Sequence, residues 1–145
     1  MANTQQHLDQ WEHNRRLLST LPAGYPDWIV TVSFYIALHA VDALLVYDGV
    51  TRINSHASRN DVLMTTRRYQ HIWDRYQQLH DLSRKVRYLA DPARWVPPAR
   101  IEQDVLKRYL YPVEESAFRL MGRPAAPPLS VQRPVPPAPS SPPPT

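Results

Sequence analysis

The chain contains no cysteine among its 145 residues and only three glycines. Without thiols, a disulfide framework, a thiolate-bound metal centre and a cysteine nucleophile are all excluded. With so few glycines, a glycine-rich phosphate-binding loop is excluded too. Any binding or catalysis must therefore rest on histidine, arginine, carboxylate and hydroxyl side chains.

Lysine is also scarce, with two residues against 15 arginines, and the charges are unevenly distributed. Residues 52–100 carry ten basic and four acidic groups, whereas residues 1–51 carry two basic and five acidic groups. A basic middle third predicts a face for an anionic partner such as RNA. The alternative is a solvated, arginine-rich helix surface.

Proline is rare in most of the chain, yet ten of the 16 prolines lie in residues 124–145. This segment has almost no large apolar side chains, so we expect a disordered tail with polyproline II bias over residues 123–145. Residues 1–122 then form one domain with one hydrophobic core. The tail is a tether or solubility extension, or its residues 133–137 (Arg-Pro-Val-Pro-Pro) dock a partner protein.

One long apolar run covers residues 28–47, which is long enough to span a membrane. It contains His39 and Asp42, and a carboxylate near the centre of a helix is costly in lipid. The N-terminal residues show no secretory signal pattern. We therefore expect a buried central helix in a cytoplasmic protein that has no membrane partner.

The periodicity of apolar residues predicts an all-α fold, an up-and-down bundle of four to five helices. We expect helices over residues 4–20, 26–48, 55–66, 67–90 and 98–121. Thr4 is expected to cap the first helix and Gly49 to end the second. Pro112 should kink or split the last helix. The fourth helix shows a regular core seam: Tyr69, Ile72, Tyr76, Leu79, Ser83, Val86 and Ala90.

Several weak motifs recur in a familiar order. They are Trp28, Phe34-Tyr35-x-Ala37-x-His39, Ala43-Leu44-Leu45, Ser55-His56-x-x-Arg59, Tyr76-x-x-Leu79, Ser83 and Arg87-Tyr88. Over residues 25–120 the chain resembles small bacterial members of the HEPN (higher eukaryotes and prokaryotes nucleotide-binding) superfamily. The resemblance implies a helical bundle, commonly a homodimer, in toxin–antitoxin, abortive-infection or CRISPR-linked systems. Many members are metal-independent ribonucleases, and others are non-catalytic RNA-binding or scaffold modules.

The catalytic members of that superfamily carry arginine followed by histidine after four to six residues. Arg75 and His80 fit this motif. Residues five apart are about 140° apart around a helix, so the two side chains meet only across a dimer or at a helix break. They are either a nuclease pair or two residues at the edges of the buried face of a helix.

A second set of residues shares one helix face. His80, Arg84 and Arg87 are spaced i, i+4, i+7, with Trp73 two turns before His80 and Tyr88 adjacent to Arg87. Such a basic stripe beside aromatic rings is suited to holding phosphate and stacking a base. The alternative is that the arginines lie over apolar surface with their charged ends in water.

His39 and Asp42 form a third candidate, at i and i+3 on the apolar helix. A buried carboxylate needs a partner, which His39 or an arginine such as Arg87 would supply. A histidine oriented by aspartate is a candidate general base, and Tyr35 would join either this arrangement or its structural alternative. The alternative is a structural polar network that fixes helix register.

The fourth candidate is Ser55-His56-x-x-Arg59, at the start of the third helix. A helix N-terminus with His56 and Arg59 is an anion site, or else Ser55 is a cap and Arg59 a surface group. We expect no metal site and no cofactor. His7 and His13 are six residues apart, His71 pairs with Asp74, and neither pair has a third ligand close in sequence.

Three functions follow from these patterns. The first is a module that binds RNA or nucleotide in a bacterial defence or toxin–antitoxin-type system. The second is a metal-independent endoribonuclease, with His80 or His39 as acid or base and Arg75, Arg84 or Arg87 stabilising phosphate charge. The third is a non-catalytic scaffold that binds a partner protein.

Overall fold

Helices account for nearly all of the ordered secondary structure. The structure is a computed structural model that describes residues 1–92, 95–131 and 142–143. Over these residues it has no strand and five α-helices: α1 (Thr4–Thr20), α2 (Pro26–Tyr47), α3 (His56–Thr65), α4 (Gln70–Tyr88) and α5 (Tyr111–Leu120). The short helical turns η1 (Arg67–Tyr69) and η3 (Pro98–Arg100) and the π-helical segment η4 (Glu102–Leu110) complete the order. The predicted all-α bundle is confirmed.

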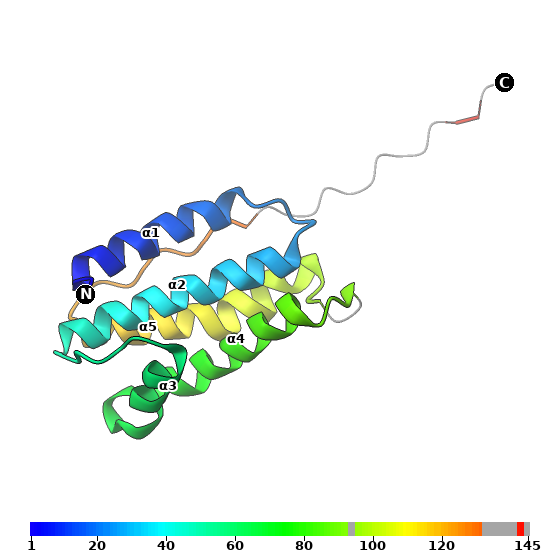
Figure 1. Cartoon of the computed structure of the whole chain (residues 1–145). Helices are drawn as coiled ribbons and strands as arrows, with labels where there is room; N and C mark the ends of the chain where they lie inside the picture. Colours follow the sequence, from blue (N-terminus) through cyan, green and yellow to red (C-terminus); the bar gives the residue numbers. More distant parts are fainter. Residues whose placement is uncertain (93–94, 132–141, 144–145) are drawn as a thin grey trace.

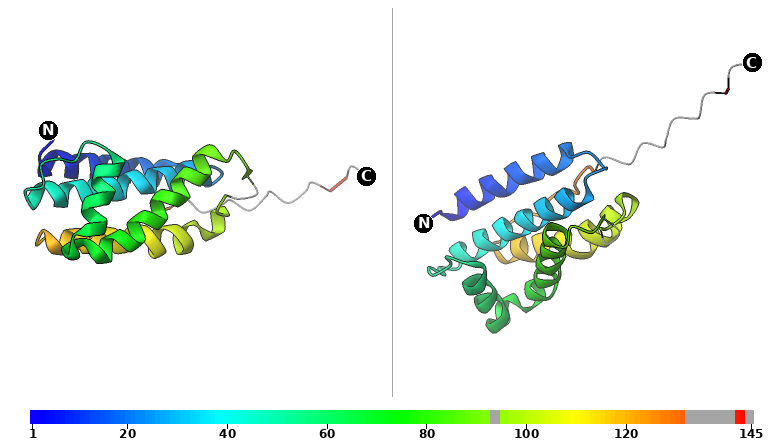
Figure 2. Two further views of the ribbon diagram at one scale, coloured as in Figure 1. Left: turned by 60° about the horizontal axis from the view of Figure 1, so that its bottom comes forward. Right: turned by 45° about the vertical axis from the view of Figure 1, so that its right-hand side comes forward.

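Helix α2 is the central member of the bundle. It contacts α1 on one side and α4, η4 and α5 on the other, while the short α3 packs against α4 (Figures 1 and 2). By length and composition α2 is apolar enough to cross a membrane, but 78% of its most apolar window is buried inside the bundle. The helix is therefore the core of this fold.

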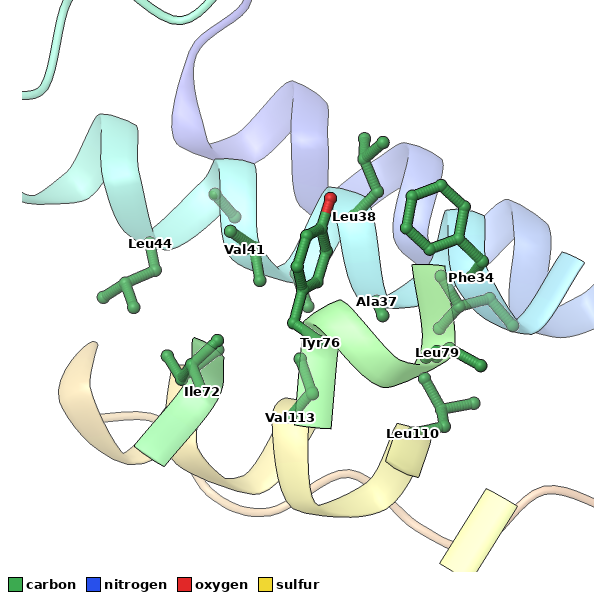
Figure 3. Packing of buried hydrophobic residues seen from close by; sticks show 14 of the residues in the cluster. Phe34, Ala37, Leu38, Val41, Leu44, Ile72, Tyr76, Leu79, Leu110 and Val113 are labelled. Carbon is green, nitrogen blue, oxygen red and sulfur yellow. The ribbon is translucent and has the colours of Figure 1, made fainter. Parts of the chain in front are cut away.

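The core forms where α2 faces α4 and α5. Figure 3 shows apolar side chains of α2 facing those of α4 and the last helical segments, including Phe34, Ala37, Val41, Ile72, Tyr76, Leu79, Leu110 and Val113. The predicted seam is buried from Tyr69 to Val86. Ala90 is the exception, because α4 ends at Tyr88 and Ala90 is exposed with a φ of 46°.

The helix ends follow local capping chemistry. Asn3, not the expected Thr4, caps α1: its side chain accepts a hydrogen bond from the Gln6 N–H at 2.8 Å, and the Asn3 backbone N–H donates one to Gln6 Oε1. Asparagine satisfies an unpaired N–H at this position better than threonine does. Gly49 follows α2 with a φ of 84°, as expected for a glycine beyond a helix end.

The last predicted helix is divided near Pro112. The π-helical η4 ends at Leu110 and α5 begins at Tyr111, which places Pro112 in the first turn of α5. Proline lacks the N–H that would continue the earlier ladder and suits a first helical turn. The expected break is confirmed, in the form of a π-helical segment followed by an α-helix.

The start of the proline-rich tail differs from the expectation. Residues 123–131 run extended along the bundle beside α1 and α5 (Figure 1), and the Leu129 N–H donates to the Tyr111 hydroxyl at 2.8 Å. Arg15 donates to the carbonyl of Pro127. The packed unit therefore extends beyond the expected boundary at Gly122, because Leu129 and Val131 add apolar contact. The expected disorder and the motif of residues 133–137 concern positions that lie mainly outside the described residues.

Candidate functional site

A buried ion pair joins α2 to α3. Arg59 donates from Nε to Asp42 Oδ1 at 2.6 Å and from Nη2 to Asp42 Oδ2 at 2.9 Å. Both side chains are less than 10% exposed. The partner of Asp42 is thus Arg59, and the expectation that His39 or Arg87 fills this role is wrong. Two parallel hydrogen bonds fix the carboxylate plane and the position of α3 against α2.

The start of α3 explains how Arg59 reaches Asp42. Ser55 caps the helix by accepting a hydrogen bond from the Ser58 N–H at 3.1 Å. Arg59 lies one turn inside the helix and turns toward α2, so it is buried. The predicted cap is confirmed, and the alternative that Arg59 is a surface group is wrong.

Two histidines from different helices meet beside this ion pair. The rings of His56, from α3, and His80, from α4, have centroids 4.9 Å apart. His80 stacks on Phe34 at 4.6 Å with an interplanar angle of 7°, while His56 is exposed and its Nδ1 lies 3.4 Å from Arg59 Nη1. Sequence spacing does not pair these two histidines, because they belong to different helices.

Both imidazoles are held neutral at pH 7. Burial lowers the pKa of His80 to about 4, and the neighbouring His56 and Arg84 add to the effect. Burial, followed by the charges of Arg59 and Arg87, lowers the pKa of His56 as well. The lowered pKa values keep both imidazoles neutral at a more acidic pH than an ordinary histidine, and a neutral imidazole can accept a proton or a hydrogen bond.

Arginine side chains extend this site along α4. Arg87 donates from Nε to the Ser83 carbonyl at 3.1 Å and from Nη1 to the Tyr35 hydroxyl at 3.4 Å. Its guanidinium lies over the ring of Tyr88 at 5.4 Å, and that ring is 74% exposed. Arg84 is exposed beside it. The predicted stripe therefore runs from the buried His80 to the exposed Arg84 and the half-buried Arg87.

An open pocket of about 270 Å³ adjoins the outer end of this stripe. Its lining consists of Asp81, Arg84, Lys85, Tyr88 and Leu89. We call the surface formed by the following residues the His56–His80 face: Tyr35, His56, His80, Arg84, Arg87 and Tyr88. It combines two neutral imidazoles, two guanidinium groups and two phenols from α2, α3 and α4.

Tyr76 reaches the inner side of the same site. Its hydroxyl is fully buried and has no hydrogen-bond partner among the described residues. Burial raises the pKa of Tyr76, and the charges of Arg59 and Asp42 also act on it. The hydroxyl is therefore a protonated donor, buried next to the Asp42–Arg59 pair.

Arg75 and Trp73 lie apart from this site. Arg75 is 3.9 Å from Asp74 and lines an open pocket of about 360 Å³ against α5. His80 instead stacks on Phe34, so the Arg75 and His80 of one chain are not brought together. Trp73 is half-buried and packs against the core, which leaves it little surface for stacking a base.

His39 has a neighbour that sequence spacing did not reveal. Its Nδ1 lies 3.2 Å from Nδ1 of His7 on α1, and burial together with His7 lowers the pKa of His39. Ligand atoms of His7, His39 and Asp42 all lie within 4.8 Å of one another. This is the third ligand that the sequence analysis did not find.

The pairing of α1 with α2 explains why His7 lies beside His39. Thr4 donates to the carbonyl of Ala43 at 3.4 Å, which fixes how α1 runs antiparallel to α2. One turn further along α1 lies His7, and one turn back along α2 lies His39.

No family model matches the chain, and no curated protein or solved structure matches it either.

Proposed function

We propose that the chain binds RNA or a nucleotide, and that the His56–His80 face holds its phosphate groups. The observation that carries the proposal is the convergence of Arg84, Arg87 and the neutral His80 of α4 with the neutral His56 of α3. The hydrogen bonds of Arg87 within the described residues go to the uncharged Ser83 and Tyr35. Its positive charge is therefore available to an anion.

The charge balance of this face favours phosphate. Asp42 neutralises Arg59 within the buried pair. Asp81 is a nearby carboxylate whose charge raises the pKa of His80. Burial and the neighbouring His56, Arg84 and Arg87 lower that pKa by more. Arg84 and Arg87 then give the face a positive character, and neutral His56 adds a hydrogen-bonding group at its edge.

Tyr88 supplies a surface for a base. Its ring is largely exposed and already lies under the Arg87 guanidinium. Stacking of a base on such a ring tolerates different sequences, since every base has a π face. The combination of arginine and exposed tyrosine supports single-stranded RNA or a nucleotide as the ligand.

The resemblance to HEPN proteins supports the same proposal, because that superfamily includes RNA-binding modules. The resemblance also leads us to expect a homodimer, a bacterial defence or toxin–antitoxin-type system, and a cytoplasmic location. A scaffold for a partner protein, through the bundle or the tail, is the competing function without RNA.

A second candidate function is metal-independent RNA cleavage. The His56–His80 pair favours it, because neutral His56 is exposed and able to accept a proton from a ribose 2′-hydroxyl. His80 is a poor acid for the leaving oxygen, since its proton is lost above about pH 4. Water would then supply the proton to the leaving 5′-oxygen, so we rank binding above cleavage.

The binding proposal is tested by fluorescence anisotropy with labelled oligouridine in EDTA at several salt concentrations. We expect salt-sensitive binding, which R84Q and R87Q each weaken, with the log–log salt slope falling by about 0.7 for each lost phosphate contact. R16Q is the matched control, because Arg16 is an exposed arginine on α1. Equal affinity in the double variant R84Q/R87Q and in R16Q would overturn the proposal.

The same RNA, followed on denaturing gels in EDTA, tests cleavage. Fragments that form with the wild type and disappear with H56A would establish the ribonuclease. The control H71A removes a histidine that lies in a different pocket, beside Arg75. Binding without RNA fragments would support the non-catalytic binding module. The absence of both binding and fragments would favour the protein scaffold.

A further inference from the structure

We propose that His7, His39 and Asp42 form a binding site for a divalent transition-metal cation, with Zn²⁺ as the best match. The three residues come from the facing surfaces of α1 and α2, and their ligand atoms lie within 4.8 Å of one another. Two imidazoles and one carboxylate are a ligand set that zinc accepts in proteins.

The spacing of the two imidazoles suits a tetrahedral metal. Nδ1 of His7 and Nδ1 of His39 are 3.2 Å apart. Two nitrogens bound at about 2.0–2.1 Å around a tetrahedral zinc lie about 3.3 Å apart. The observed separation therefore matches the nitrogen–nitrogen distance of two imidazoles that bind one cation.

The third ligand is already oriented. Asp42 is held by two hydrogen bonds from Arg59, and such outer partners fix the direction of a ligating carboxylate. Arg59 also carries a positive charge, which lowers the affinity for a cation compared with an unpaired carboxylate. The site should therefore prefer a metal that binds imidazole nitrogen strongly over Mg²⁺ or Ca²⁺, which depend on carboxylates.

A pocket leaves room for a further ligand. A space of about 150 Å³ lies beside the cluster, lined by His7 and Asp42 together with Met1, Ala2, Val46, Val50 and Ile53. Three protein ligands at zinc leave one position, which water or a small anion occupies in open sites. The pocket provides the space for that group.

The competing explanation is a simple hydrogen bond between two neutral imidazoles. One Nδ1–H donating to the other Nδ1 accounts for a 3.2 Å separation without a metal. The metal explanation accounts in addition for the carboxylate and the pocket at the same place. It predicts binding that needs both histidines, whereas a hydrogen bond predicts no binding.

Calorimetric titration of the untagged chain with ZnCl₂, after EDTA treatment and dialysis, tests the proposal. We expect one zinc per chain, and H7A and H39A should each weaken binding by more than about tenfold, since even outer partners of metal ligands are worth about 10- to 100-fold. Tetrahedral ligand-field bands with Co²⁺ should appear in the wild type and be lost in both variants.

The control is H13A, which removes an exposed histidine from the same helix. It should bind zinc as the wild type does, and circular dichroism should confirm that each variant is folded. If H39A does not fold, H7A at a half-buried position carries the test. No stoichiometric binding, or equal zinc affinity in H7A and H13A, would overturn the proposal. The RNA experiments contain EDTA, so the two proposals fail or succeed independently.

Discussion

Two buried ion pairs of the same chemistry lie in different parts of this bundle. Arg15 and Glu114 join α1 to α5, with side chains 8% and 3% exposed. Asp42 and Arg59 join α2 to α3, with side chains 8% and 9% exposed. By burial alone the two pairs are nearly equal, yet their surroundings differ.

The first pair is enclosed by structural partners. Trp11 donates from Nε1 to Glu114 Oε2 at 2.8 Å, and its ring lies 5.0 Å from the Arg15 guanidinium carbon. Arg15 also donates to Pro127 in the extended segment. Helix, aromatic ring and tail together satisfy this pair, which we call the closed pair.

The second pair is surrounded by groups that are exposed or lack a hydrogen-bond partner. Arg59 contacts the exposed His56, and Asp42 lines the pocket beside His7. The buried hydroxyl of Tyr76 lies next to it without a partner in the described part of the chain. We call this the open pair. Adjacent space does not distinguish the two pairs, since Glu114 also lines a pocket, of about 120 Å³. They differ in the exposed histidine and the partnerless hydroxyl around the open pair, which buried charge alone would not reveal.

The largest effect is expected from breaking the closed pair. E114A leaves Arg15 buried without its counter-charge, because Pro127 and Trp11 cover it. Removal of one partner of a buried pair costs about 3–5 kcal/mol. We expect a loss of this size in the free energy of unfolding, measured by urea denaturation.

Glu115 is the control for this change, since it is the adjacent carboxylate and is exposed. The substitution E115A should alter the unfolding free energy by no more than about 0.5 kcal/mol. A similar small loss for E114A would mean that Arg15 escapes to solvent and that the pair is not closed.

The second expected effect is a response to mild acid at the open pair, where the histidines lie. The pKa of His80 is lowered from 6.5 to about 4 in the fold, so between these values the unfolded chain binds more protons. Stability should therefore fall as the pH drops from about 6.5 to about 4, by no more than about 3 kcal/mol for this group. The lowered pKa values of His39 and His56 act in the same direction.

Urea denaturation at several pH values measures this slope. H80Q should reduce it, whereas H13Q, at an exposed position on α1, should leave it unchanged. Proton NMR should show the His80 ring titrating near pH 4. Titration near the ordinary value would mean that His80 is solvated and that its stacking on Phe34 does not persist.

Periodicity and capping were sufficient to predict the fold. The seam of α4 has a 3-4 spacing, and the five buried seam positions that follow Tyr69, up to Val86, result from that spacing alone once α4 is helical. Gly49 and Pro112 mark boundaries because their backbones are restricted in known ways. Asn3 and the packed segment up to Val131 were missed, since both depend on competition between neighbouring caps or on contacts distant in sequence.

The candidate site was predictable only in part. Spacing on one helix identified His39 with Asp42 and His80 with Arg84, because residues three or four apart share a face. The partners Arg59, His56 and His7 come from other helices, and only packing determines which side chains meet across a bundle. For Arg75 and His80, helix geometry predicts that the two side chains of one chain lie apart, and the structure agrees, since both belong to the continuous helix α4.

The smallest stability effect is expected from the matched change at the open pair. D42A should lower the free energy of unfolding by about 1–3 kcal/mol, less than E114A, because Arg59 can turn toward solvent beside the exposed His56. Freed from Asp42, Arg59 adds a charge to the His56–His80 face. Oligouridine affinity should therefore rise in D42A, with a salt slope steeper by about 0.7, while zinc binding is lost.

E114A completes this last test as the matched variant, because it also removes the carboxylate partner of an arginine, but of one that stays buried between α1 and α5. It should leave the oligouridine affinity unchanged wherever it remains folded. Equal stability losses in D42A and E114A would show that the two pairs are equally enclosed. An unchanged RNA affinity in D42A would show that Arg59 does not face the phosphate, because a freed guanidinium within reach of a polyanion must strengthen its binding.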